Sequence, residues 1–306
     1  MVNKSKKYKI LILVVIGLVF LGLGCAGKNS EGSSIAQNTS SGGTPVQEAT
    51  AVKSQSTSVK GSDTLLPLAQ AEAEKFLNEN PGKSVSVTGG GTGVGIAALI
   101  DKGVDIATAS REMTTDEIKK ANANGINPVE HVIAYDGITV VVHPKNPISK
   151  LTFNQLRGIY NGSISNWKQV GGEDKPISTI SRDSSSGTYA DFKKDVLLGD
   201  EFRPDALTQA TTGGIVTEVA QNPNAIGYIG FAYVDNNIKV LSLDKGNGSV
   251  LPTTQSILSG TYPLSRSLYF YTNGEPTGLT KEFCDFVLSE KGQNIVSKVG
   301  FIPLKK

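Results

Sequence analysis

Short apolar strands alternate with amphipathic helices along residues 58–306, and this alternation restricts the possible folds more than any other feature. In the run KSVSVTGG, for example, apolar residues recur at every second position, and the helical run GIAALIDKG follows. Alternating strands and helices predict an α/β fold with largely parallel sheets. The pattern restarts after about residue 144, so we expect two α/β lobes joined near residues 140–150 and 250–265. We expect two short strand segments around Asp136 and Gly137.

Three loops rich in glycine, serine and threonine each lead from a strand into a helix start. They span residues 62–65, 89–95 and 182–188. A helix N-terminus carries unpaired N–H groups and a partial positive charge, so it attracts anions, and hydroxyl groups donate further hydrogen bonds. In open α/β sheets such loops lie at the carboxyl ends of the strands, where ligands bind. One loop alone is compatible with an ordinary turn, but three of them near an arginine predict an oxyanion site.

Arg182, in the stretch SRDSSSGTYADF, is the strongest single candidate for anion binding. Its planar guanidinium suits two oxygens of a tetrahedral anion and stays charged at any relevant pH. The alternative is a surface salt bridge with Asp183 or Asp191. Arg111 is left open between a ligand-related role and an ordinary surface charge.

Several other kinds of site lack the residues that they need. The run GGGTGVGI has neither the Lys-Ser/Thr of a P-loop nor the glycine spacing of a dinucleotide site. The only two histidines are His131 and His143, so we expect no metal site and no cofactor. The chain has no G-x-S-x-G motif and no evident base beside the run SSSGT, so we expect no enzyme activity.

The N-terminus is typical of a targeting segment. The basic stretch KSKKYK precedes the apolar run ILILVVIGLVFLGLG, which ends at Cys25. We expect residues 1–25 to be a signal segment with lipidation of Cys25; the alternative is an uncleaved N-terminal anchor. The polar composition of residues 26–57 predicts a flexible tether. An exported, membrane-anchored protein follows from either alternative.

The charge of the remaining chain argues against a nucleic-acid binder. The basic residues at the extreme N-terminus are Lys4, Lys6, Lys7 and Lys9. Without them the 30 basic residues fall to 26, against 28 acidic residues, so the body has no basic excess. Any anion must therefore be bound by the local arrangement of donor groups, and not by a net positive charge of the body.

The body resembles the phosphate-binding proteins of phosphate ABC importers. The resemblance covers about residues 58–306 and rests on segments that occur in the order of that family. These segments are GSDTLLPLAQAEAEKF, VTGGGTGVGIAAL, DIATASRE, SRDSSSGTYADF, AIGYIG and YPLSRSLYFYTN. The resemblance implies a two-lobed, type II periplasmic-binding-protein-like fold that closes on one phosphate in the cleft between its lobes.

The resemblance also implies the residues of the phosphate site. By position they are Ser62, Thr64, the Leu65 backbone, Thr92, Arg182, Ser186, Gly187 and Thr188. In some members an aspartate of the DIATAS segment accepts the proton of hydrogen phosphate, but here that position is Ser110. Sulfate carries no proton, so a fixed carboxylate would face it with an unpaired negative charge. Asp63 is the preferred candidate for this acceptor, although it could be an ordinary N-cap, and Asp136 is the second candidate.

We therefore predict an exported, monomeric receptor for inorganic phosphate that delivers its ligand to the permease of an ABC importer. Lobe 1 should comprise residues 58–143 and 255–306, and lobe 2 residues 144–254. The alternatives are the same fold with another oxyanion, such as sulfate or molybdate, and a phosphate-sensing or adhesion protein. A phosphatase is disfavoured because neither a metal cluster nor a nucleophile with its base is evident.

Overall fold

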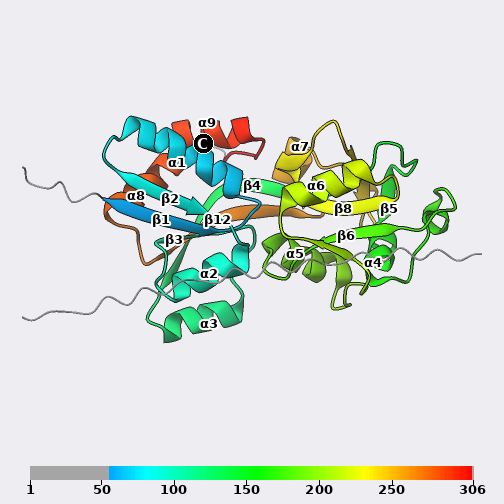
Figure 1. Cartoon of the computed structure of the whole chain (residues 1–306), viewed down its shortest axis with the longest axis horizontal. Helices are drawn as coiled ribbons and strands as arrows, with labels where there is room; N and C mark the ends of the chain where they lie inside the picture. The colour runs from blue at the N-terminus through cyan, green and yellow to red at the C-terminus, as the bar shows by residue number, and fades with distance from the viewer. Residues whose placement is uncertain (1–54, 305–306) are drawn as a thin grey trace, which may run out of the picture. The chain divides into compact units, whose positions relative to one another are not determined.

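The computed structural model describes residues 55–304 of the chain (Figure 1). The predicted signal segment, Cys25 and residues 26–54 of the predicted tether lie outside this range. Strand β1 (Ser56–Gly61) takes in the last two residues of the predicted tether, 56 and 57. Between residues 55 and 304, none of the helices has the length and apolar composition needed to cross a membrane.

Most strands belong to one sheet of nine strands, in the order β2-β1-β3-β12-β4-β8-β6-β7, with β9 paired to β4. The remaining strands of this sheet are β2 (Ser84–Thr88), β3 (Ile106–Ala109), β4 (Pro128–Val142), β6 (Ser178–Arg182), β7 (Leu207–Gln209), β8 (Ala225–Gly230), β9 (Lys239–Val240) and β12 (Ser265–Asn273). A smaller sheet contains β5 (Lys150–Thr152), β10 (Ser242–Asp244) and β11 (Ser249–Val250).

The strands near the two ends of the large sheet are parallel, whereas its middle is antiparallel. β1 pairs in parallel with β2 and β3, and β6 pairs in parallel with β7 and β8. β12 runs antiparallel to β3 and β4, and β4 runs antiparallel to β8. The predicted α/β fold is confirmed, but the large sheet is mixed because β4 and β12 cross its middle.

Helices follow most of these strands, as the alternation predicts (Figure 1). The α-helices are α1 (Leu66–Glu79), α2 (Thr92–Ile100), α3 (Thr115–Ala123), α4 (Phe153–Asn161), α5 (Gly187–Phe192), α6 (Thr212–Gln221), α7 (Thr254–Leu258), α8 (Gly278–Leu288) and α9 (Glu290–Val299). Shorter helical turns are η1 (Trp167–Val170), η2 (Lys193–Leu197) and η3 (Phe231–Tyr233). The predicted capping box of Thr152 and Gln155 is present at α4.

β4 is a single 15-residue strand, although the sequence pattern predicts two segments. Its first part pairs with β12, up to the pair Gly137 and Ser265. Its second part pairs with β8, from Ile138 opposite Gly230 onward. Asp136 and Gly137 therefore mark a change of partner within a continuous strand, not a turn.

The buried hydrophobic residues form two groups of clusters, which we call the first and the second core group. The first core group draws on residues 59–134 and 268–301. The second draws on residues 138–264 and on Ile302. Ile257, Tyr262 and Leu264 belong to the second core group. β4 is the strand that passes from one core group to the other (Figure 1).

Candidate anion-binding site

Buried hydroxyl groups from four segments that each follow a strand meet at one place. The Thr64 and Thr188 hydroxyl oxygens lie 3.2 Å apart, and those of Thr92 and Ser110 lie 3.3 Å apart. The four residues are at most 1% exposed. They follow β1, β6, β2 and β3, respectively. The structure therefore brings together residues that are up to 124 positions apart in the sequence. We call these four residues the hydroxyl cluster.

The start of α5 lies directly against the hydroxyl cluster. Ser186 is the N-cap residue, and its hydroxyl accepts a hydrogen bond from the Tyr189 N–H at 3.3 Å. A Cβ atom on Gly187 would lie 2.5 Å from both the Ser110 and the Thr92 hydroxyl oxygens. Only glycine therefore lets the α5 backbone approach these hydroxyls so closely. Gly187 and Ser186 are themselves buried.

Arg182 ends β6 beside the hydroxyl cluster and is only 2% exposed. Its guanidinium donates from Nε to the Gln209 carbonyl, from Nη1 to the Thr212 hydroxyl and from Nη2 to the Ala210 carbonyl, at 2.8–3.1 Å. Nη2 also lies 3.3 Å from Asp63 Oδ2. Burial lowers the pKa of Arg182, while Asp63 and Asp183 oppose this shift.

These contacts change two expectations for Arg182. The alternative of a surface salt bridge with Asp183 or Asp191 is wrong, because Arg182 is buried and its ion pair within residues 55–304 is with Asp63. Arg182 also has fewer free donors than the expected contact with two anion oxygens requires. A guanidinium has five N–H donors, and four contacts engage them here. One Nη1 donor remains, which suits a single anion oxygen.

Asp63 connects two loops and does not cap a helix. The N-cap of α1 is Leu65, which has no side-chain capping bond. Asp63 Oδ1 accepts from the Gly90 N–H at 3.0 Å, and Oδ2 faces Arg182. The alternative role of Asp63 as an ordinary N-cap is therefore wrong. Its carboxylate instead holds the β2–α2 loop near the guanidinium.

Asp136 forms a buried ion pair with Arg266, the residue directly opposite it on β12. Arg266 Nε and Nη2 lie 3.1 and 2.7 Å from Asp136 Oδ2, and the Phe231 N–H donates to Oδ1 at 2.8 Å. The side chains of Asp136 and Arg266 are 0% and 7% exposed. A Cβ atom on Gly230 would lie 2.9 Å from Asp136 Oδ2 and 3.0 Å from Thr64 Cγ2, so this pair borders the hydroxyl cluster.

Arg266 also contacts the cluster itself, and sequence reasoning missed it. Its Nη1 donates to the Thr188 hydroxyl at 3.1 Å and lies 3.9 Å from Asp191, whose pKa is raised by burial. In the run SRSLYFYTN, Arg266, Leu268 and Phe270 stand at every second position, as residues on one face of a strand do. An arginine in phase with apolar residues of a strand indicates a buried charge, and this signal was available in the sequence.

Two tyrosines fix the backbone around the site. The Tyr228 hydroxyl lies 2.7 Å from the Ser181 hydroxyl and accepts from the Arg182 N–H at 3.2 Å, and its ring stacks on Phe192 of α5 at 4.0 Å. Burial raises the pKa of Tyr228, so its hydroxyl stays protonated. The Tyr233 hydroxyl donates to the Asp63 and Thr64 carbonyls at 2.9 and 3.1 Å. Neither tyrosine was predicted.

The remaining candidates have structural partners. Arg111 makes two hydrogen bonds of 2.8 Å to Glu117, at the start of α3. His131 Nε2 lies 2.9 Å from the Thr272 hydroxyl, and His143 Nδ1 accepts from the Lys145 N–H. Among residues 55–304, no group of three or more His, Cys, Asp and Glu side chains is placed to hold a metal ion.

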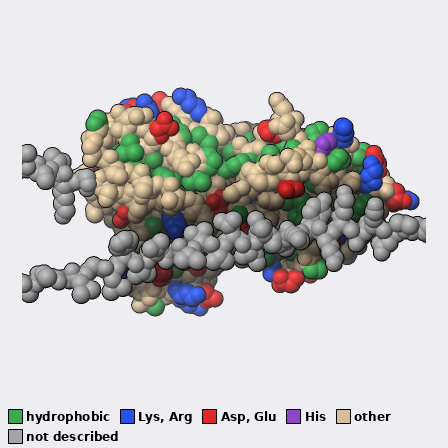
Figure 2. Space-filling model, in the orientation of Figure 1, with side chains coloured by type: hydrophobic (Ala, Val, Ile, Leu, Met, Phe, Trp, Pro, Cys, Tyr) green, Lys and Arg blue, Asp and Glu red, His purple; other side chains and the backbone are tan. Residues whose placement is uncertain are grey.

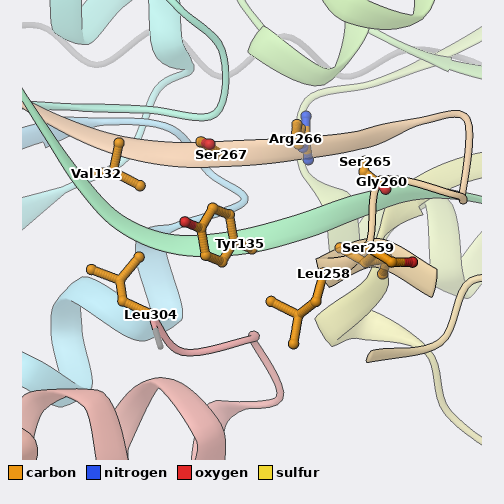
Figure 3. A pocket seen from close by; sticks show the side chains of 10 residues that line it. Val132, Tyr135, Leu258, Ser259, Gly260, Ser265, Arg266, Ser267 and Leu304 are labelled. Carbon is orange, nitrogen blue, oxygen red and sulfur yellow. The ribbon is translucent and has the colours of Figure 1, made fainter. Parts of the chain in front are cut away.

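Two open grooves lie beside the β4–β12 pair. The groove in Figure 3 has a volume of about 690 Å³ and is bordered by Tyr135, Leu258, Ser267, Leu304 and others. Tyr135 neighbours Asp136 along β4, so its side chain points to the opposite face of the sheet. Arg266 lines this groove as well. A second groove of about 700 Å³ is bordered by Arg111, Asp191, Lys194 and Arg266. The hydroxyl cluster lines neither groove.

A family model for the PBP superfamily domain matches residues 40–291. The chain is 35% identical over 253 residues to the phosphate-binding protein PstS of Bacillus subtilis, covering 82% of this chain and 81% of the relative. It is 34% identical over 277 residues to the phosphate-binding protein PstS of Pseudomonas aeruginosa, covering 84% and 85%.

The chain belongs to the phosphate-binding protein family of the PBP superfamily.

Solved structures of family members agree with the fold. A Clostridium perfringens protein assigned to phosphate ABC transport and solved with bound phosphate is 36% identical, with a TM-score of 0.75 over 82% of this chain and 100% of that one. An ABC-type phosphate transport receptor from Vibrio cholerae is 32% identical, with a TM-score of 0.68 over 81% and 100%. The predicted periplasmic-binding-protein-like fold is thereby confirmed.

Proposed function

We propose that this protein is an exported receptor that binds inorganic phosphate and delivers it to an ABC importer. The observation that carries the proposal is the buried hydroxyl cluster, which contacts Arg266 and the α5 N-terminus, while Arg182 pairs with Asp63, the residue before Thr64. Hydroxyls and N–H groups can each donate a hydrogen bond to a phosphate oxygen, and the positive charges of two arginines attract the anion. The family membership supports this ligand, because the relatives named above are phosphate-binding proteins.

The fixed charges around the cluster nearly cancel. Arg182 faces Asp63, and Arg266 is paired with Asp136. Neutral donors must therefore supply much of the attraction for a phosphate dianion. Binding through hydroxyl and N–H dipoles needs a closed, dry site, because water weakens such bonds.

We assign the site to the boundary between two lobes that close on the phosphate. The two core groups support this division, because β4 passes between them at the site. Ile257, Tyr262 and Leu264 pack in the second core group. We therefore place the return of the chain to lobe 1 nearer residue 265 than the residue 255 expected from the sequence. Phosphate would be bound by the predicted residues Ser62, Thr64, Leu65, Thr92, Ser110, Arg182, Ser186, Gly187 and Thr188, with Arg266 in addition.

The first test is calorimetric titration of the protein with phosphate and with sulfate. We expect micromolar or tighter phosphate binding and sulfate binding at least about 100-fold weaker, because a misplaced buried charge is strongly rejected. Thr188→Val should weaken phosphate binding about tenfold or more by removing a hydroxyl of the cluster.

A matched control lies on the strand before Arg182. Thr179 on β6 is also buried, but between residues 55 and 304 its hydroxyl has no hydrogen-bond partner. Thr179→Val should therefore leave phosphate affinity unchanged. Equal binding of phosphate and sulfate, or equal loss in both variants, would contradict the assignment. Hydrolysis of a phosphomonoester above the blank rate would favour an enzyme.

We propose Asp136, rather than Asp63, as the acceptor of the proton of hydrogen phosphate. Asp63 bridges two groups: its Oδ1 accepts from the Gly90 N–H, and its Oδ2 accepts from Arg182 Nη2. The Asp136 side chain is 0% exposed, against 11% for Asp63, and it borders the hydroxyl cluster through Gly230. Its Oδ1 accepts a hydrogen bond from the Phe231 N–H and keeps a second lone pair for the phosphate proton. This assignment reverses the order expected from the sequence.

Asp136→Asn and Asp63→Asn distinguish the two carboxylates. We expect Asp136→Asn to reduce the ratio of phosphate to sulfate affinity at least tenfold, because the amide no longer rejects an unprotonated anion. Asp63→Asn should weaken both anions by similar factors, since it acts through Arg182 and the Gly90 loop. Titration calorimetry of both variants with both anions measures this ratio. The opposite pattern would restore Asp63 as the acceptor.

The membrane attachment remains part of the proposal. We propose that Cys25 carries a lipid that anchors a monomeric receptor to the outer side of the membrane. Mass spectrometry of the protein purified from membranes should find a lipid-modified Cys25 as the first residue.

A further inference from the structure

Two loops from different core groups touch each other directly beside the site. The Gly93 N–H donates to the Ser185 carbonyl at 2.9 Å. The Ser185 hydroxyl lies 3.2 Å from the Gly90 carbonyl. Gly90 and Gly93 lie between β2 and the first turn of α2, whereas Ser185 precedes α5. We call this set of contacts between Gly90–Gly93 and Ser185 the clasp.

Gly91 makes the close approach in the clasp possible. Its φ is +96°, in the region that favours glycine. A Cβ atom there would lie 2.3 Å from the Ser185 hydroxyl oxygen and 2.7 Å from its carbonyl oxygen. The backbone carbonyl cannot rotate away as a side chain could. A methyl group on Gly91 would therefore push the two loops apart.

The clasp lies at the edge of the site and does not use its donors. Gly90 is exposed and Ser185 is half-buried, whereas the hydroxyl cluster is fully buried. The clasp bonds join only main-chain groups and the Ser185 hydroxyl, which also lies within hydrogen-bond distance of Asp183. One hydrogen bond links the clasp to the site: the Gly90 N–H donates to Asp63, which in turn faces Arg182.

From this geometry we infer that the clasp holds the two lobes together without help from phosphate and thereby sets how fast phosphate is released. This inference rests on the proposed function. In an open form the clasp groups would bond to water, so they favour closure by only a small difference in free energy. Such a difference in free energy raises the population of the closed state. A ligand that is held only in the closed state is released more slowly when that state is more stable.

Gly91→Ala tests the inference, with Gly82→Ala as a matched control. Gly82 has a φ of +88°, but its added Cβ would meet nothing within 4 Å. Both variants place alanine at a positive φ, and only Gly91→Ala also disturbs the clasp. We expect phosphate release from Gly91→Ala to be at least tenfold faster than from Gly82→Ala, with a much smaller change in the association rate. Stopped-flow measurement with a fluorescent phosphate sensor gives both rates.

Ser185→Ala, with Ser184→Ala as its control, tests the clasp with a smaller change. Ser185→Ala removes the hydroxyl contact but keeps the carbonyl that Gly93 uses, so release should accelerate about two- to fivefold. Ser184 is exposed, and Ser184→Ala should behave as the unmodified protein. This pair decides the question if Gly91→Ala does not fold.

The outcomes separate the clasp from the proposed function. If the unmodified protein does not bind phosphate, the proposed function fails. If it binds phosphate and Gly91→Ala releases it at the rate of Gly82→Ala, the clasp is refuted. If Gly91→Ala does not fold and Ser185→Ala releases phosphate as Ser184→Ala does, the clasp is likewise refuted. Parallel slowing of association and acceleration of release would also contradict it, because that pattern indicates damage to the site itself.

Discussion

Glu72→Met is expected to raise the free energy of unfolding by about 3 kcal/mol at pH 7. Glu72 lies in α1 and is 0% exposed. Between residues 55 and 304, neither of its carboxylate oxygens has a hydrogen-bond partner. Burial raises the pKa of Glu72 from 4.5 to about 9. Methionine has a similar length and no polar group to desolvate, so it should fit the same space at a lower cost.

The gain should depend on pH, with a sign that follows from the raised pKa. Below pH 4.5 the carboxyl group is neutral in both the folded and the unfolded chain, so it adds no pH dependence. As the pH rises from 4.5 towards 9, the unfolded chain loses this proton while the folded chain keeps it. The unmodified protein should therefore lose about 1.4 kcal/mol of stability per pH unit in this window relative to Glu72→Met.

Urea unfolding of both proteins at several pH values between 5 and 8 measures this difference. Glu74→Met is the matched control, because Glu74 lies on the same helix but is exposed. The control should shift stability little and without this pH dependence. A constant difference between Glu72→Met and the unmodified protein across the pH range would show that Glu72 is ionised or paired in the folded chain.

The local parts of this structure are those that the sequence could predict. The capping box of Thr152 and Gln155 depends on residues three positions apart, and it is present. The loops after β1, β2 and β6 were expected to meet because the carboxyl ends of parallel strands share one edge of a sheet. Thr64, Thr92 and Thr188 do lie together. Such features follow from short-range pattern and from one rule of sheet topology.

The features that the sequence left undetermined depend on pairing across long separations. Arg266 reaches the site only because β12 pairs with β4, 130 residues earlier in the chain. Asp63 could be an N-cap by its position, but its carboxylate is drawn to Gly90 and Arg182 from two other loops. No local pattern distinguishes a capping aspartate from one with distant partners. Glu72 is a similar case, because its place on α1 does not show that both oxygens are buried.

Arg266→Met is expected to lower the free energy of unfolding by about 3–5 kcal/mol in phosphate-free buffer, because removing one partner leaves a buried charge uncompensated. The Asp136 side chain is 0% exposed, and Arg266 supplies two of its hydrogen bonds. After the substitution, the Phe231 N–H would be the one hydrogen-bond partner left to Asp136 within residues 55–304. Phosphate-free buffer matters, because bound ligand would add stability of its own.

A second substitution at Asp136 tests whether the uncompensated charge is the cause of the loss. Asp136→Asn added to Arg266→Met should restore most of the lost stability, because the amide is neutral and its oxygen can still accept from Phe231. Lys281→Met provides a control for removing one cation from an exposed pair, since Lys281 and Asp285 are 58% and 61% exposed. Exposed pairs contribute little, so this control should unfold almost as the unmodified protein does. If the double variant is no more stable than Arg266→Met, the loss comes from the packing of the arginine side chain and not from its charge.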